Sequence, residues 1–236
     1  MFDGILMFVY RAPMIIVSTV IMASCSVLCM PFDRDGSLQM TCARFWGKLL
    51  CIWMGIRVKV EGLDNLDLSR NYIFVSNHLS YADTPVLLAN IPANFRFMPK
   101  ASLFKIPFLG DHLRTAGHIP VSTDNPRDAV RSMNEAGKIV REKGISVLVF
   151  PEGGRSNGAF GTFKGGAAFL AIKAGVPVAP VGLMGTREIM PRGSKVIHPG
   201  DVLVRIGEAV ETEGLNLKER DALTAELHER VGRLIG

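Results

Sequence analysis

Short apolar runs alternate with helix-like segments along most of the chain, and this alternation restricts the fold more than any other feature. Runs rich in β-branched and aromatic residues predict strands at residues 58–60, 72–76, 95–98, 118–121, 146–150, 178–181 and 202–206. Strands that alternate with helices favour an α/β sheet. A chain of 236 residues is long enough for one such domain and a short appendage.

Three segments between and after these strands predict helices. Asn125 and Pro126 form a cap and a first helical residue for an amphipathic helix that continues over residues 128–142 and ends at Gly144. A short buried helix is predicted over residues 164–174, closed by glycine, and a terminal amphipathic helix over residues 218–235. We expect His228, on that last helix, to be a surface residue.

The N-terminal part of the chain differs from the rest. Residues 12–32 carry no charge, and 21 residues in a helix suffice to cross a hydrocarbon core of about 30 Å, although Pro13 and several small polar residues keep a tilted or half-inserted helix open. Residues 38–60 mix aromatic and basic side chains, as segments at a membrane interface do, and a helix packed on the domain is the alternative. We therefore predict a membrane-associated helical segment over residues 1–57 and an α/β domain over residues 58–236.

Composition narrows the classes of partner and of site. The net charge of +5 favours anionic lipid or a phosphate-bearing substrate, and no segment resembles a nucleic-acid module. The four cysteines all lie within the first 51 residues without a Cys-x-x-Cys pair, so neither a disulfide nor zinc is expected. His112 and His118 have no cysteine or carboxylate cluster in sequence to complete a metal site, and we place them in a loop and a strand near the pocket.

A histidine and a carboxylate follow the second predicted strand. His78 and Asp83 are five residues apart, and Thr84 and Pro85 begin the helix that comes next. The turn would therefore lie at the carboxyl edge of the sheet, where open α/β folds bind ligands. If the turn folds back, Asp83 can bond one imidazole nitrogen and leave the other free to accept a proton. A structural hydrogen bond is the alternative for this pair taken alone.

A second segment carries groups suited to an anion. The strand at residues 146–150 is followed by Pro151, Glu152, Gly153, Gly154 and Arg155. Glycines expose backbone donors, and a guanidinium is a rigid fork that matches phosphate. A surface turn with a solvated arginine is the alternative.

These segments resemble those of glycerophospholipid acyltransferases, in particular the 1-acylglycerol-3-phosphate acyltransferases. Residues 77–83 resemble the His-x4-Asp block of that family, and residues 150–156 resemble its Phe-Pro-Glu-Gly-Thr-Arg-Ser block, with Gly154 in the threonine position. Residues 100–110 and 176–181 resemble two further blocks, in the expected order, and the resemblance spans roughly residues 60–207. The acidic-arginine pair of the second block is absent after residue 121, so Arg127 or Arg131 is a candidate replacement.

The resemblance implies a single α/β domain with a mixed central sheet flanked by helices, of the glycerol-3-phosphate acyltransferase type. It implies transfer of a fatty acyl group from an acyl thioester to the free hydroxyl of 1-acylglycerol-3-phosphate, giving phosphatidic acid. In that reaction His78 would act as general base, supported by Asp83, without a covalent intermediate. The candidate substrate-binding residues are Asn77, Lys100, Lys105, Glu152, Gly153, Gly154 and Arg155. An apolar run at residues 104–109 is a candidate acyl groove or plain core.

The same hypothesis sets the partners and the location. The acyl donor would be acyl-CoA or acyl carrier protein, the acceptor a lysophospholipid, and no cofactor or metal is expected. Basic residues are more numerous after residues 12–32 than before them, so a spanning helix would place the main domain on the cytoplasmic face of the membrane. Two alternatives remain: an acyltransferase for another lysolipid, and a serine esterase in which Ser156 of Gly-Arg-Ser-Asn-Gly is the nucleophile. A non-catalytic membrane-binding protein that kept only the fold is a third, against which the intact His78 and Asp83 count.

Overall fold

The structure is a computed structural model, and it describes residues 7–33, 35–106, 109–122, 125–155, 160–191, 193–194 and 196–236. Its strands are β1 (Ile56–Glu61), β2 (Ile73–Ser76), β3 (Phe95–Phe97), β4 (Ser146–Val149), β5 (Val178–Met184) and β6 (Gly200–Ile206). Its α-helices are α2 (Ala12–Cys29), α3 (Ser37–Met54), α4 (Asp83–Asn90), α5 (Leu109–Thr115), α6 (Pro126–Lys143), α7 (Gly166–Ala174), α8 (Thr186–Ile189) and α9 (Arg220–Ile235).

The six strands form one mixed sheet in the order β1-β6-β5-β2-β4-β3. Strands β5, β2, β4 and β3 run parallel to one another, and β6 pairs with β5 in the antiparallel direction and with β1 in the parallel direction. This arrangement confirms the mixed α/β sheet. It also brings the carboxyl ends of β2, β4 and β3 to the same edge of the sheet.

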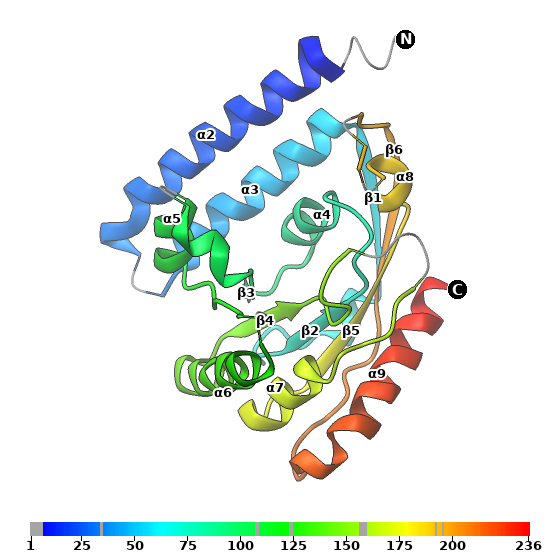
Figure 1. The fold of residues 1–236 in the computed structure, drawn as a ribbon. Coiled ribbons are helices and arrows are strands. Elements are labelled where there is room, and N and C mark those ends of the chain that lie inside the picture. Colours follow the sequence, from blue (N-terminus) through cyan, green and yellow to red (C-terminus); the bar gives the residue numbers. More distant parts are fainter. Residues whose placement is uncertain are drawn as a thin grey trace.

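Helices cover both faces of the sheet (Figure 1). Alternate residues of β2 point to opposite faces: Phe74 packs into a core with residues of α3 and α4, whereas Ile73 and Val75 pack into a second core with residues of α6, α7 and α9. Every residue of β2 is therefore buried, which explains why its sequence is a continuous apolar run.

Helices α2 and α3 form a hairpin beside the α4 side of the sheet (Figure 1). Helix α3 approaches α4 closely at Gly47, where an added Cβ would lie 2.7 Å from the carbonyl oxygen of Pro85. Other residues of α3, such as Phe45 and Ile52, remain exposed. Helix α3 therefore packs on the domain, and it also presents apolar side chains to the outside.

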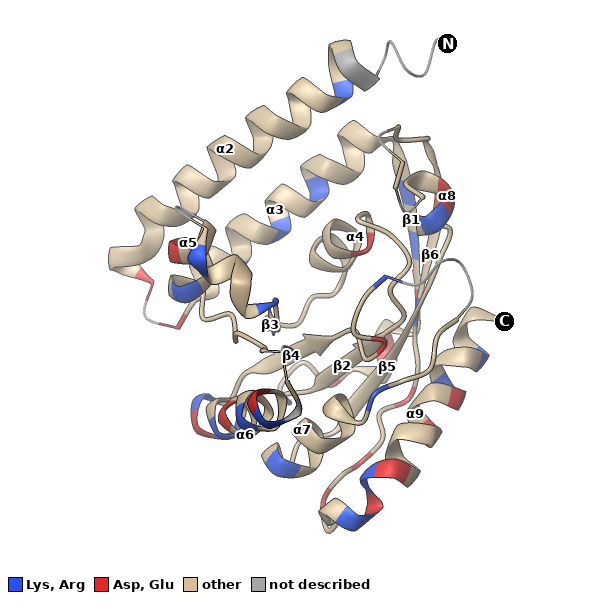
Figure 2. Cartoon of the chain, in the orientation of Figure 1, with Lys and Arg blue, Asp and Glu red and all other residues tan. Residues whose placement is uncertain are grey.

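Among the described residues, one helical stretch, Val9–Phe32, is long and apolar enough to cross a membrane. Its 24 residues correspond to roughly 36 Å of helix. Figure 2 shows α2 almost without charged residues, in contrast to α6 and α9. This apolar N-terminal helix fits membrane association.

Two predictions about elements are wrong. Residues 118–121 do not form a strand: Val121 makes an isolated parallel bridge with Lys100, and the N–H of Ile119 donates to the carbonyl oxygen of Phe97 in β3, but a continuous ladder is not formed. His228 is not a surface residue: its ring is half-buried, stacks on Phe160 at 4.4 Å, and bonds the carbonyl oxygen of Gly161 through Nε2. The helix predicted over residues 128–142 is confirmed, with Asn125 as its N-cap and Gly144 after its last residue.

Candidate active site

His78 lies two residues beyond β2, at the edge where the parallel strands end. Glu152 occupies the equivalent place after β4, the neighbour of β2. Its Oε1 accepts a hydrogen bond of 2.8 Å from the backbone N–H of His78, and its Oε2 accepts one of 3.2 Å from the N–H of Gly161. Glu152 thus ties the His78 turn to the segment that follows β4.

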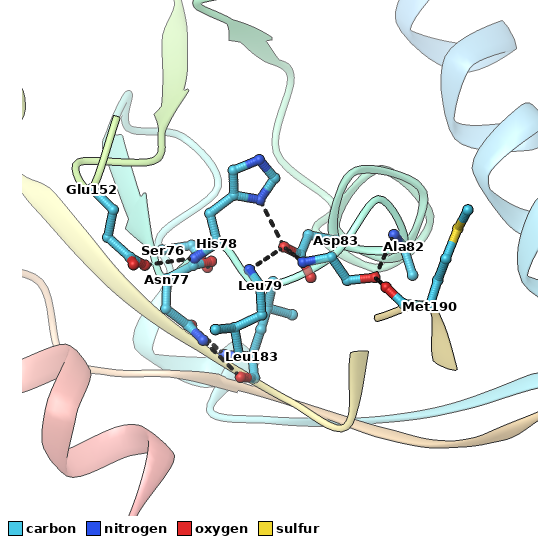
Figure 3. A network of polar contacts seen from close by, with 10 residues as sticks. Ser76, Asn77, His78, Leu79, Ala82, Asp83, Glu152, Leu183 and Met190 are labelled. Atoms are coloured by element: carbon cyan, nitrogen blue, oxygen red, sulfur yellow. Dashed lines mark hydrogen bonds and ion pairs between the residues drawn. The ribbon is translucent and has the colours of Figure 1, made fainter. Parts of the chain in front are cut away.

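Asp83 holds the imidazole of His78 from the other side (Figure 3). The distance from His78 Nδ1 to Asp83 Oδ2 is 2.7 Å, and the same oxygen accepts bonds from the N–H groups of Leu79 and Ser80. Asp83 is fully buried at the first residue of α4, where the helix dipole favours a carboxylate. Since an ionised carboxylate only accepts, Nδ1 carries the proton and Nε2 keeps its lone pair. The predicted base geometry is present.

Phe150 fixes the plane of the imidazole. Its ring is stacked on that of His78, with centroids 4.0 Å apart and planes inclined by 14°. Phe97 stacks in turn behind Phe150 at 6.5 Å. The orientation of the His78 ring is therefore fixed by two groups: the carboxylate of Asp83 bonds its edge, and the ring of Phe150 covers one face.

Asn77 is predicted to bind substrate, but in the structure its side chain bonds the backbone of β5. Its side-chain amide donates to the carbonyl oxygen of Leu183 at 2.9 Å and accepts from the N–H of Leu183 at 2.8 Å, so it extends the pairing of β2 with β5. The side chain is fully buried and lies away from the cavity described next. Asn77 positions its neighbour His78.

A cavity of about 1620 Å³ extends from His78 to the helical hairpin. Its walls are mostly apolar and come from α2, α3, α6 and the edge of the sheet. The described lining includes three cations, Lys100, Lys164 and Arg220, and no carboxylate. The cavity therefore combines a proton acceptor with a surface suited to an acyl chain and with positive charge.

The residues predicted for phosphate and acyl binding are only partly gathered here. Gly153, Gly154 and Lys100 line the cavity, whereas Lys105 is not among its described lining residues. Arg155 is not among them either, because its guanidinium lies over the ring of Tyr81, 3.3 Å from the centroid. Of the predicted acyl groove, Leu109 lines the cavity, Phe104 is buried core and Ile106 is exposed. Ser156 and Phe108 lie outside the described residues, as does residue 123.

His112 and His118 also line the cavity, although His112 lies on α5 and His118 in the loop after it, so the element predicted for each is wrong. His118 Nδ1 accepts from the N–H of Phe97, and burial lowers the pKa of this imidazole to about 3. Burial also lowers the pKa of His112, whose Nδ1 contacts Ser26 Oγ at 3.1 Å. Both rings are thus neutral structural groups between the sheet and α2.

Sequence reasoning missed two lining cations. The sequence pattern predicts Lys164 at the start of a helix and Arg220 within the terminal helix. The apolar run before Lys164 gave no signal for a site. Arg220 lies far along the chain from His78, and only the packing of α9 beside α7 brings it to the cavity.

Comparison with known proteins identifies the family. The family model "Acyltransferase" matches residues 57–184. A chloroplastic 1-acyl-sn-glycerol-3-phosphate acyltransferase BAT2 of Brassica napus is 38% identical over 171 residues, which cover 71% of this chain and 49% of that protein. The human 1-acyl-sn-glycerol-3-phosphate acyltransferase alpha is 32% identical over 170 residues, covering 72% of this chain and 60% of that protein.

A solved structure is similar over nearly the whole chain. The crystal structure of PlsC, the 1-acyl-sn-glycerophosphate (LPA) acyltransferase of Thermotoga maritima, has a TM-score of 0.80 and 29% identity, and the match covers 98% of this chain and 94% of that one. The chain spans about half the length of the Brassica relative. With a family model that matches more than half of its residues, the chain belongs to the acyltransferase family.

Proposed function

We propose that this protein is a 1-acylglycerol-3-phosphate O-acyltransferase, which moves a fatty acyl group from an acyl thioester to the free hydroxyl of a lysophosphatidate and gives phosphatidic acid. The observation that carries the proposal is that His78, bonded to Asp83, lines a large and mainly apolar cavity. A general base beside a surface for acyl chains suits a lipid alcohol. The names of the related proteins support the same acceptor.

The chemistry needs one base and no enzyme nucleophile. His78 Nε2 takes the proton of the acceptor hydroxyl, and the alkoxide oxygen attacks the thioester carbonyl. The tetrahedral intermediate then expels the thiolate, which takes the proton from the imidazolium and leaves His78 neutral again. Asp83 stabilises the imidazolium through Nδ1. A thiol pKa of about 8.5 makes the thiolate a good leaving group. The backbone near Gly153 and Gly154, which lines the cavity, is the candidate donor to the oxyanion.

The proposal also covers the acyl donor and the location of the protein in the cell. The donor is acyl-CoA or acyl carrier protein, and no cofactor takes part. Insertion of α2 would hold the cavity beside membrane lipid, with the α/β domain on the cytoplasmic face. Purified protein incubated with labelled acyl-CoA or acyl carrier protein, and with a panel of lysolipids, identifies donor and acceptor by mass detection of the products.

One pair of variants tests the base. His78→Ala should lower acyl transfer at least about 100-fold, because it removes the proposed base. Thermal unfolding of the variant checks that the fold is intact. His228→Ala is the matched control, since His228 also stacks on a phenylalanine and lies outside the cavity lining. Retained transfer in His78→Ala would remove the proposed base.

Two alternatives give different outcomes in the same assays. An acyltransferase for another lysolipid would prefer a different acceptor from the panel. A serine esterase would lose turnover in Ser156→Ala, whereas the proposed transferase should keep most of its activity in that variant.

A further inference from the structure

We infer that Lys164 and Arg220 form the site that recognises the phosphoryl group of the acceptor. This assignment rests on the proposed function and names the residues of its acceptor site. It differs from the sequence-based expectation, in which Arg155 holds that group.

Lys164 reaches the segment that supports the base. Its ammonium lies over Gly153, where an added Cβ would be 2.6 Å from Lys164 Nζ, and Gly153 closes the turn that starts at Phe150. Phe150 is the residue stacked on His78. The backbone N–H of Lys164 donates to the carbonyl oxygen of Pro151 at 2.9 Å, which fixes the lysine beside this turn.

Arg220 supplies the second cation from the other end of the chain. Its side chain lies over Gly165, the residue after Lys164, where an added Cβ would be 3.0 Å from Arg220 Nε. Its guanidinium pairs with Asp221 at 2.8 Å, but both side chains of that pair are exposed, so it contributes little stability and a substrate phosphate can compete for it. Glycine at both positions leaves room for these two long side chains.

The charge balance of the cavity favours an anion at this place. The described lining residues include Lys100, Lys164 and Arg220 and no carboxylate, and Asp221, the exposed partner of Arg220, lies outside that lining. Lysine and arginine bind phosphate through charge-assisted hydrogen bonds, which are stronger than neutral ones. The rest of the lining is mostly apolar, so a lipid with a phosphorylated head matches both parts.

The position of Lys164 distinguishes the acceptor phosphate from those of the donor. In 1-acylglycerol-3-phosphate the phosphoryl group is attached to the carbon next to the one that bears the reacting hydroxyl. In a coenzyme or carrier-protein donor, the nearest phosphate lies beyond the whole pantetheine arm. Lys164 Nζ lies over the turn that starts at Phe150, the residue stacked on His78, and this position therefore suits the acceptor phosphate.

The test compares Lys164→Gln and Arg220→Gln with two control variants that remove one charge nearby, Lys173→Gln on α7 and Lys218→Gln before α9. Neither control residue is among the described lining of the cavity. KM and kcat are measured for lysophosphatidate, for acyl-CoA, and for 1-acylglycerol as an acceptor without phosphate. Thermal unfolding of each variant reports folding.

We expect each site variant to raise the KM for lysophosphatidate about tenfold, with kcat and the KM for acyl-CoA nearly unchanged and the preference for lysophosphatidate over 1-acylglycerol reduced. Lys164→Arg should restore most of the loss, because it keeps the charge. An unchanged KM for lysophosphatidate, or a rise confined to the donor, would overturn the assignment while leaving the proposed function standing. Wild-type protein that does not acylate lysophosphatidate would overturn both.

Discussion

Phe150 lies flat against the imidazole of His78, with ring centroids 4.0 Å apart and planes inclined by 14°. Phe150 is the first residue after β4, and His78 follows the neighbouring strand β2. The parallel pairing of these two strands therefore brings a stacking partner to the base, while Asp83 bonds its edge.

Replacing Phe150 by leucine tests the value of this stacking. Phe150→Leu should lower kcat about 3- to 10-fold, because an aromatic contact of this kind is worth roughly 0.5–1.5 kcal/mol beyond its buried area and here orients the base. Steady-state kinetics measures the effect. Phe160→Leu is the control: it removes the stacking on His228 at 4.4 Å and should leave kcat unchanged. Equal losses in the two variants would point to a general effect on folding.

Asp83→Asn should reduce kcat by about 10²- to 10⁴-fold, because an amide does not stabilise the imidazolium and can impose the wrong tautomer. The double variant with His78→Ala should be no slower than His78→Ala alone, since both residues act as one unit. Single-turnover rates of the two single variants and the double variant give the coupling free energy between His78 and Asp83. Additive losses would mean that Asp83 acts independently of His78.

Asn77→Ala should destabilise the fold by about 2 to 4 kcal/mol, because it leaves the N–H and the carbonyl group of Leu183 buried without their partners. Denaturant unfolding in detergent micelles measures this change. Asn90→Ala is the comparison: Asn90 makes a single bond to Val86 within its own helix, and its loss should cost less than about 1 kcal/mol.

His118 predicts a specific dependence of stability on pH. Burial, with smaller contributions from His112 and Arg96, lowers the pKa of His118 to about 3 in the folded chain, against an ordinary value of 6.5. The unfolded chain therefore binds the extra proton between these values. The stabilisation is fully present above about pH 6.5 and is lost as the pH falls toward 3, at about 1.4 kcal/mol per pH unit.

His118→Asn provides the measurement, because its side chain keeps an acceptor for the N–H of Phe97 and does not titrate. Unfolding at pH 7.5 and at pH 5 should show a smaller decrease for the variant than for the wild type. Equal decreases would mean that His118 is accessible to protons in the folded chain.

The sequence predicted the parts of the site that lie within a few residues of one strand end. His78 and Asp83 meet because a turn of five residues separates them, and Asn125 and Gly144 mark the ends of α6 through local backbone preferences. These interactions are short in sequence, so residue spacing is enough to foresee them.

Interactions between distant segments were not predictable in this way. Arg155 stacks on Tyr81, and Asn77 pairs with Leu183, because of contacts that only the assembled sheet creates. The segment at residues 118–121 has the composition of a strand, but it makes one isolated bridge, at Val121, and one backbone bond from Ile119 to β3. Strand propensity describes the conformation that a segment favours by itself, whereas the segments that pack beside it decide whether it joins a sheet.

Helix α2 has a different surface on each side. Thr19, Ala23 and Ser26 line the cavity, whereas Ile16 and Ile21 are exposed and lie outside that lining. Val20, Val27 and Leu28 do both, because they are exposed and also line the cavity. A bulkier side chain at one of these positions would narrow the space open to a bound chain, whereas one at Ile16 or Ile21 would change only the outer surface of the protein.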